Sequence, residues 1–251
     1  MGGARRAQRE ALSGPSKITE HVYWLPPGPP DKPSLCAVAG DRSTLWLDAG
    51  SSEAHARGFL DWLAGEGVTP PAFVVFTHSH WDHVFGAAEL GAIVVAHRLT
   101  AAALRELADT DWSDEALDAR VARGEVGAAH AEHVKEELPS PRDVRIAPAD
   151  VVFENGLDFD LGGVTVRVRH VGGDHAPDSC VMHVEPDDVL FLGDCLYQAP
   201  SGGHTAELAL PLHEAVLGFG ADVFVEGHSE TVLPRAEVDE LISQDQATLG
   251  T

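Results

Sequence analysis

The most constraining feature of this sequence is a histidine-rich segment that directly follows a run of apolar residues. Residues 72–77 (AFVVFT) come after two prolines and form a continuous apolar run, which predicts a buried strand. The next six residues, 78–83, read His-Ser-His-Trp-Asp-His. Three imidazoles and one carboxylate after a buried strand predict a metal site, because these ligands suit zinc and its neighbours in the first transition row.

The spacing within this segment predicts ligands for two neighbouring metals. His78 and His80 are two residues apart, so their side chains point the same way from an extended backbone. Asp82 and His83 begin the next turn and can face a second, adjacent position. The alternative interpretation is a polar helix cap with incidental histidines. The coincidence of four ligand-type residues after one strand disfavours that alternative.

A site for two metals needs further ligands, and three later segments each place a ligand-type residue after a predicted strand. These residues are His175 after residues 164–170, Asp194 after residues 189–192, and His228 after residues 223–226. Loops at one edge of a sheet are where a rigid scaffold commonly carries chemistry. We therefore take all three as candidate ligands, with His170 as a competitor of His175 for which we favour a core or strand-end role.

The rest of the chain predicts mixed strands and helices. Short apolar segments separated by turn residues predict strands in the first fifty residues, at residues 72–77 and 93–96, and again from residue 164. The Ala-, Leu- and Glu-rich residues from 98 to about 138 predict helices. We expect a flexible tail over residues 1–17 and a single domain over residues 18–251, with a helical insertion at about residues 98–139.

Taken in order, the candidate ligands resemble the metal-binding motifs of the metallo-β-lactamase superfamily over about residues 18–232. The segment LWLDAG, which contains Asp48, resembles the short turn that this family carries ahead of its first helix. The resemblance implies an α/β fold, a four-layer αββα sandwich of two mixed β-sheets flanked by helices. It also implies a first metal held by His78, His80 and His175, a second held by Asp82, His83 and His228, and Asp194 as a bridge between them.

The implied activity is hydrolysis by a binuclear zinc enzyme, with iron or manganese as alternative metals. A hydroxide held between two cations about 3.5–4 Å apart is a nucleophile at neutral pH. Asp82 lies beside this nucleophile and is the candidate catalytic residue, which orients it or returns a proton to the leaving group. The expected substrate is a small molecule with an ester, lactone, thioester or related acyl bond.

Departures from the family pattern leave the substrate branch open. Asp174 and Ala176 flank His175 where the usual motif is Gly-His-Thr. The β-lactam hydrolysers that the HAPDS run resembles use Cys where Asp194 stands and commonly a Lys just after it, so β-lactam hydrolysis is kept only as an alternative. A thioesterase of glyoxalase II type carries a helical domain after the last His, whereas only residues 229–251 follow here.

Several residues near the ligands are candidates for contact with the substrate. Gly-Asp-x-x-Tyr, ending at Tyr197, resembles the acyl-homoserine lactonase branch, in which the Tyr contacts the substrate carbonyl. A pocket wall or core position is the alternative for Tyr197. Trp81 is a second candidate pocket residue, and His204 has no assigned role. The insertion is expected to cover the site, and Trp112, His130 and His133 are candidates to reach it. For His130 and His133 we favour an exposed helix face over a metal pair.

Two other functions remain in competition with the hydrolase. One is a mononuclear iron oxidoreductase on the same fold, like the persulfide dioxygenases, which uses the first ligand set alone. The other is a non-catalytic metal-binding protein. Both ligand sets are complete in this sequence, which favours the hydrolase.

Charge and composition bear on partners and location. The chain has 17 Lys+Arg against 40 Asp+Glu, a formal net charge of −23, which argues against nucleic acid and anionic membranes as partners. No apolar run approaches the length of a membrane span, and the basic N-terminus lacks the apolar region of a secretory signal. Three widely spaced cysteines suit a reducing compartment. We expect a cytoplasmic protein, and no pattern predicts its oligomeric state.

Overall fold

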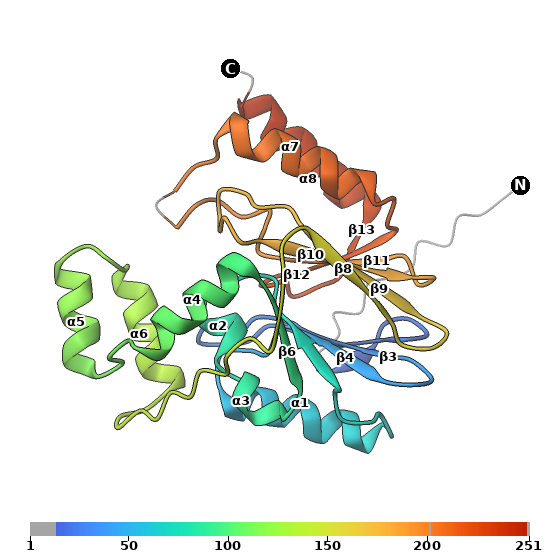
Figure 1. Cartoon of the computed structure of the whole chain (residues 1–251). Coiled ribbons are helices and arrows are strands. Elements are labelled where there is room, and N and C mark those ends of the chain that lie inside the picture. Colours follow the sequence, from blue (N-terminus) through green and yellow to red (C-terminus); the bar gives the residue numbers. More distant parts are fainter. Residues whose placement is uncertain (1–13, 201, 250–251) are drawn as a thin grey trace, which may run out of the picture.

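The computed structural model describes residues 14–200 and 202–249, which form two β-sheets between layers of helices (Figure 1). In spatial order the first sheet contains β1 (Ser16–Lys17), β2 (Val22–Leu25), β3 (Leu35–Ala39), β4 (Thr44–Leu47), β5 (Phe73–Val75), β6 (Ile93–His97) and β7 (Val151–Phe153). The second contains β13 (Leu233–Pro234), β12 (Val223–Glu226), β11 (Val189–Gly193), β10 (Cys180–Glu185), β9 (Thr165–His170) and β8 (Gly156–Asp160).

Both sheets are mixed, and helices cover their outer faces. Strands β4 to β7 pair in parallel, as do β11 and β12, while the other pairs are antiparallel. The outer face of the first sheet is covered by α1 (Glu53–Gly65) and α3 (Ala87–Leu90), and that of the second by α7 (Ala206–Gly218) and α8 (Arg235–Leu249). The expected four-layer αββα sandwich is therefore confirmed.

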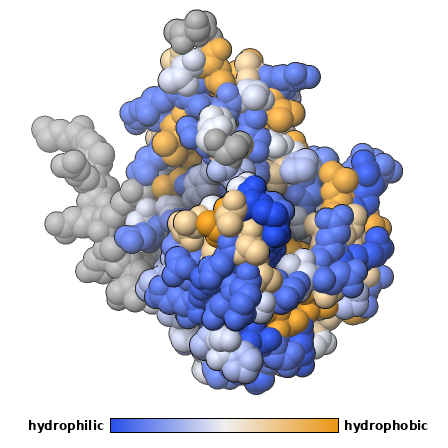
Figure 2. All heavy atoms as spheres, turned by 90° about the vertical axis from the view of Figure 1, so that its left-hand side faces the viewer, coloured by the Kyte–Doolittle hydropathy of each residue, from blue (hydrophilic) through white to orange (hydrophobic). Residues whose placement is uncertain are grey.

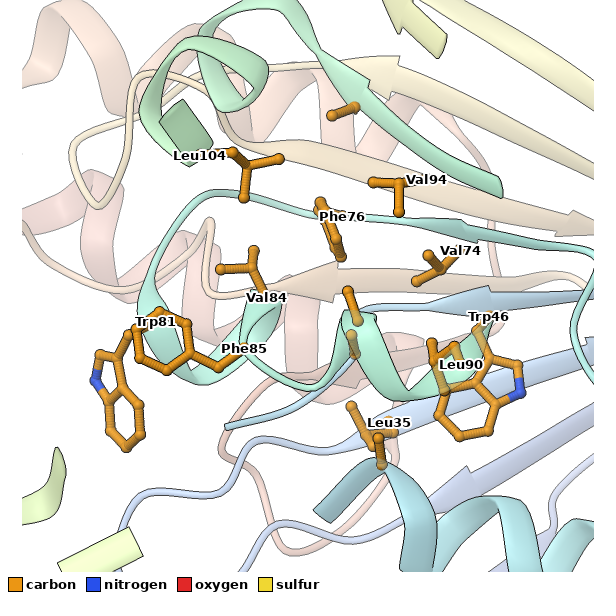
Figure 3. Packing of buried hydrophobic residues seen from close by; sticks show 14 of the residues in the cluster. Leu35, Trp46, Val74, Phe76, Trp81, Val84, Phe85, Leu90, Val94 and Leu104 are labelled. Atoms are coloured by element: carbon orange, nitrogen blue, oxygen red, sulfur yellow. The ribbon is translucent and has the colours of Figure 1, made fainter. Parts of the chain in front are cut away.

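The central strands are predominantly apolar because both faces of each sheet are buried. In β4, Trp46 packs against Phe59 of α1 with ring centroids 4.9 Å apart, while Leu45 and Leu47 face the second sheet. Figure 3 shows part of the cluster beneath the first sheet, in which Val74 of β5 lies near Trp46. A strand buried in this way leaves its polar residues to the loop that follows it.

Strand directions bring the candidate ligands to one edge of the molecule. Parallel β11 and β12 end at the same edge, and β9 runs in the same direction because β10 is antiparallel to both β9 and β11. The backbone N–H of Cys180 donates to the carbonyl of Thr77 over 2.7 Å and ties the second sheet to the end of β5. The N–H of Ser34 donates to the carbonyl of Gly227 over 2.6 Å and makes a second link there.

Three helices occupy the region expected to be a helical insertion: α4 (Arg98–Ala108), α5 (Asp114–Ala122) and α6 (Ala128–Glu137). They lie at the left of Figure 1, beside the short helix α2 (Trp81–Val84). Strand β7 is exposed and β8 half-buried, and neither was predicted, nor was α7, which contains Pro211. No helix among the described residues is long and apolar enough to cross a membrane.

The expected tail over residues 1–17 needs correction at its end. Ser16 and Lys17 form β1 and pair antiparallel with Tyr23 and Trp24 of β2. Residues 1–13 lie outside the described residues, so the tail there remains a prediction.

A buried histidine in α1 makes the stability of the fold sensitive to acid. Ser52 caps this helix by accepting a hydrogen bond from the N–H of His55 over 3.0 Å, and the His55 side chain is buried. Burial, reinforced by the charge of Lys32, lowers the pKa of His55 to about 3. The unfolded chain binds this proton near pH 6.5, so the folded state loses stability as the pH falls from about 6.5 towards 3.

We expect His55→Gln to remove part of this acid sensitivity. In metal-free protein, the loss of unfolding free energy between pH 7 and pH 5 should be smaller by about 2 kcal/mol in the variant than in the wild type. Urea unfolding at the two pH values, with a chelator present, measures both losses. Equal losses in the two proteins would contradict this assignment.

Candidate metal centre

The seven candidate ligands converge at the sheet edge and form two groups. Within each group, one ligand atom from every residue lies within 4.8 Å of those of the others. The first group contains His78, His80 and His175, and the second contains Asp82, His83, Asp194 and His228. This grouping follows the division implied by the family motifs.

Local structure explains how one short segment serves both groups. His78 and His80 lie in the extended chain between β5 and α2, and His80 is the N-cap of that helix, with φ −62° and ψ 146°. Asp82 and His83 lie within the single turn of α2, so their side chains leave the backbone in another direction. The change from extended to helical backbone at Trp81 therefore separates the two sets of ligands.

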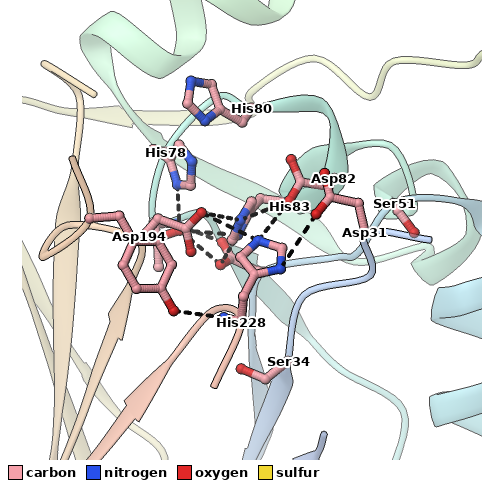
Figure 4. Close-up of polar contacts among 12 residues, drawn as sticks. Asp31, Ser34, Ser51, His78, His80, Asp82, His83, Asp194 and His228 are labelled. Atoms are coloured by element: carbon pink, nitrogen blue, oxygen red, sulfur yellow. Dashed lines mark hydrogen bonds and ion pairs between the residues drawn. The ribbon is translucent and has the colours of Figure 1, made fainter. Parts of the chain in front are cut away.

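Asp194 lies between the two groups (Figure 4). Its Oδ2 is 3.4 Å from Nε2 of His83 and of His228 in the second group, and also 3.4 Å from Nε2 of His175 in the first. A Cβ added at Gly227 would stand 2.0 Å from Asp194 Oδ1, so the loop after β12 can pass this carboxylate only with glycine there. This position suits a ligand shared by two cations.

Unsatisfied buried atoms show that the cluster fits metal ions. His78 Nε2, His83 Nε2 and Asp194 Oδ1 are buried and make no hydrogen bond within residues 14–200 and 202–249. Buried polar atoms are nearly always hydrogen-bonded in folded proteins, and these three lie in one cluster. Imidazole nitrogen and carboxylate oxygen together are ligands for divalent zinc and related metals. The residues present therefore fit a pair of such ions.

The charges of the two groups differ before any metal binds. Burial lowers the pKa of His78, and burial with the neighbouring His175 lowers that of His80 to about 4, so both imidazoles are neutral at pH 7. For His228 the effect of burial is outweighed by hydrogen bonds to Asp194 and Asp82, which raise its pKa to about 10. His83, beside the same two carboxylates, also has a raised pKa. Cations in the second group would take the place of these protons.

A buried aspartate outside both groups orients His83. Asp48 accepts hydrogen bonds from the N–H of Thr77 over 2.6 Å, from the Thr77 hydroxyl over 2.8 Å, and from His83 Nδ1 over 2.7 Å. With the Nδ1 proton held by Asp48, His83 presents Nε2 to the second group. The φ of Asp48 is 62°, a conformation that Asn and Asp adopt more readily than other residues with a side chain. The LWLDAG turn thus contributes a supporting carboxylate.

A cavity of about 1170 Å³ opens onto both groups. Helices α4 to α6 form its far wall, so the insertion lines the site as expected. Figure 2 shows the face that lies at the left of Figure 1, where hydrophilic and hydrophobic residues are mixed and no single apolar area dominates. The insertion contributes several residues to the lining of the cavity, among them Ala103, Leu107, Trp112, Arg120, Val126 and His130.

Some of the residues predicted to lie near the ligands line the cavity, and others do not. Tyr197 and Trp81 both line the cavity, and the Tyr197 hydroxyl accepts a hydrogen bond from the N–H of His228 over 3.1 Å. His170 belongs to neither group and stacks on His97 with ring centroids 3.9 Å apart. His204 does not line the cavity and lies 3.8 Å from Asp174.

Sequence reasoning missed Asp31 and Arg120, which line the cavity, and favoured an exposed helix face for His130 over a position that reaches the site. His130 was expected on an exposed helix face, but its ring lies edge-on to Trp81 with centroids 6.1 Å apart. Asp31 lies 3.0 Å from His133 and 3.8 Å from His228. Arg120 lies near the end of α5. Nothing in their local sequence marks these residues, because they reach the cavity only through the packing of the insertion and of the loop before β3.

Comparisons with known proteins agree with this architecture. A family model described as the metallo-beta-lactamase superfamily matches residues 30–249. A search of curated protein sequences finds no match. Among solved structures, a metallo-beta-lactamase from Pontibacter korlensis is 20% identical, with a TM-score of 0.65 over 92% of this chain and 98% of its own. A metallo-beta-lactamase from Hirschia baltica is 17% identical, with a TM-score of 0.62 over 91% and 95%.

A larger protein shares the same fold. The sec-alkylsulfatase Pisa1 from Pseudomonas sp. is 17% identical, with a TM-score of 0.70 over 94% of this chain but only 41% of its own. Structural similarity at identities this low shows a common fold. It does not assign the activities of these neighbours to this chain.

Proposed function

Because the chain belongs to the metallo-β-lactamase superfamily, we propose that it is a binuclear zinc hydrolase that cleaves an ester, lactone, thioester or related acyl bond of a small molecule. Family membership and the two ligand groups support a metal-dependent hydrolase in general. The observation that carries the binuclear proposal is the position of Asp194, which lies 3.4 Å from histidines of both groups.

The residues around the cavity have complementary tasks in such a reaction. Bound metal ions would supply a water nucleophile at neutral pH and polarise the oxygen of the scissile bond. Asp82 is buried, and His83 and a hydrogen bond from His228 hold the pKa of its carboxyl low despite the opposing effect of burial. We propose that this carboxylate orients the attacking water and passes its proton to the leaving group.

Tyr197 is placed to assist at the substrate oxygen. Its hydroxyl oxygen already accepts the N–H of His228, so its own hydrogen remains available to donate. Burial raises the pKa of this phenol, which therefore keeps its proton at neutral pH. We propose that Tyr197 donates to the oxygen on which negative charge develops, and that Trp81 forms an apolar wall beside it.

The proposal extends to partners and location. A cavity of this size suits a small-molecule substrate, and the net charge of −23 disfavours nucleic acid and anionic membranes. Cys36, Cys180 and Cys195 are all free and buried, which supports a reducing compartment such as the cytoplasm.

Metal analysis combined with a substrate panel tests the proposal. We expect two zinc ions per chain by elemental mass spectrometry, and we expect turnover of one or more lactones, esters or thioesters. A chelator should abolish that turnover and added Zn²⁺ should restore it. Full activity without metal would overturn the proposal, as would phosphodiester cleavage without any acyl turnover.

The same panel separates the alternatives. One iron per chain with oxygen consumption would favour the mononuclear oxidoreductase. Turnover confined to β-lactams would favour that branch, although Asp194 stands where its members use Cys. Metal binding without turnover of any substrate would favour a non-catalytic protein.

A further inference from the structure

The cavity wall formed by the insertion carries a guanidinium group with two buried donors that make no hydrogen bond to any described residue. Arg120 lies over the ring of Trp112, with its Cζ 4.7 Å from the ring centroid. Its Nε and Nη2 atoms are buried and have no hydrogen-bond acceptor among the residues that the structure describes. A guanidinium carries five N–H donors and is always charged, so leaving buried donors unsatisfied is costly. A ligand that supplies acceptors would remove this cost.

Arg120 lines the same cavity as the two ligand groups, and a series of ring contacts joins it to them. Trp81, next to Asp82, lies edge-on to Phe85 with centroids 5.9 Å apart (Figure 3). Phe85 in turn contacts Trp112 at 4.9 Å, and Trp112 carries Arg120. Of these rings, Trp81 and Trp112 line the cavity, so an apolar stretch of its wall lies between the guanidinium and the metal groups.

The platform under Arg120 is held in place by hydrogen bonds. Trp112 Nε1 donates to the carbonyl of Leu107 over 3.2 Å, and the Trp112 carbonyl accepts from Arg142 Nη1 over 3.2 Å. Arg142 also pairs with Asp114 at the start of α5 over 2.7 Å. A guanidinium stacked on a fixed ring loses less conformational freedom when it binds a ligand.

The charges around Arg120 indicate which anion it suits. Of the described residues that line the cavity, Arg120 is the only Lys or Arg, whereas Asp31, Glu106 and Glu125 are acidic, in addition to Asp82 and Asp194 of the ligand groups. Glu125 is already bound by Arg123 through hydrogen bonds of 2.5 and 2.9 Å. One cation among these carboxylates suits a single, singly charged anion better than a doubly charged phosphate. The planar carboxylate matches the guanidinium fork in a bidentate pair.

We propose that Arg120 is an anion-binding subsite of the cavity, and that the substrate carries a carboxylate separated by an apolar stretch from the bond that is cleaved. This inference rests on the proposed acyl hydrolase and names a class of substrate for it. Arg120 binds the carboxylate at the insertion, the aromatic wall contacts the carbon chain, and the acyl group lies at the metal groups.

Matched substrate pairs test this subsite. The pairs are mono-p-nitrophenyl esters of glutarate and adipate, each compared with the uncharged acyl ester of the same chain length. We expect the wild type to prefer the carboxylated member of at least one pair. Arg120→Gln should lower kcat/KM for that member by about 10- to 100-fold and leave the uncharged ester within about twofold. Arg120→Lys should recover part of the loss, since it restores charge without the fork.

Arg105→Gln is the matched control. Arg105 is exposed on α4 and does not line the cavity, so the same change of charge should leave both esters unaffected. Thermal unfolding of each variant shows whether the fold is retained. An equal loss on charged and uncharged esters in Arg120→Gln, or no preference for the charged ester in the wild type, would overturn the subsite while the hydrolase stands.

A binding measurement keeps the subsite testable if the proposed function fails. If zinc-loaded protein hydrolyses none of the esters, calorimetric titration with glutarate and adipate replaces kinetics. Tighter binding of a dicarboxylate by the wild type than by Arg120→Gln would support the subsite without the hydrolase. Equal binding by the two proteins would overturn it.

Discussion

Replacing Asp194 with Asn is expected to abolish hydrolysis and to deplete metal from both ligand groups. Among the described residues its carboxylate lies between the groups, 3.4 Å from His83, His175 and His228. Asn removes the negative charge and one of the two oxygens, so it cannot serve two cations equally. We expect kcat/KM to fall by about a thousandfold or more, which corresponds to a loss of roughly 4 kcal/mol in transition-state stabilisation.

Elemental analysis and kinetics together measure this effect. The bound metal should fall from two ions per chain to one or fewer, and circular dichroism should show a retained fold. Asp61→Asn is the matched control, because Asp61 is exposed on α1 and far in sequence from every candidate ligand. Wild-type metal content and activity in Asp194→Asn would contradict the assignment of Asp194 as the shared ligand.

Replacing Asp48 with Ala is expected to destabilise the fold more than most single substitutions. Asp48 is fully buried and accepts the N–H and hydroxyl of Thr77 as well as His83 Nδ1. Its removal leaves these donors buried without an acceptor, and Ala tolerates the φ of 62° poorly. We expect a loss of about 3–5 kcal/mol in the free energy of unfolding of metal-free protein, the range found when one partner of a buried pair is removed.

Asp48→Asn distinguishes the role of Asp48 in orienting His83 from its role in stabilising the fold. Asn adopts positive φ readily and retains one acceptor oxygen, so the fold should survive. The hydrogen bond that orients His83 is weakened, and residues that orient a ligand typically contribute 10–100-fold in metal affinity. We expect a zinc affinity lower by about that factor, measured by competition with a chromophoric chelator. Wild-type affinity in Asp48→Asn would show that Asp48 supports only the fold.

Local sequence patterns predict the order of the buried strands and of the candidate ligands that follow them. Apolar runs such as residues 72–77 predict buried strands because both faces of a central strand are covered, and the structure places β5 there. Exposed β7 and half-buried β8 were missed because they are short: β7 has three residues, and β8 has five with only two apolar side chains, Leu157 and Phe159. Helix α7 was missed because Pro211 lies inside it.

The contacts of single residues were harder to predict than the elements that carry them. His130 and Arg120 lie on helices whose weak amphipathicity indicates exposed faces, and only the packing of the insertion turns both towards the cavity. The close approach of Gly227 to Asp194 is evident only once β11 and β12 are paired.

Local sequence pattern alone identified His78, His80 and Asp82 as candidate metal ligands, because their spacing restricts the directions of their side chains. The residues that surround these ligands are known only from the way the chain folds. Arg120 of the insertion lines the same cavity as the ligand groups, and Asp194 lies between two histidine groups, because segments far apart in the chain meet there. Contacts between distant segments depend on tertiary packing, which a local sequence pattern does not specify.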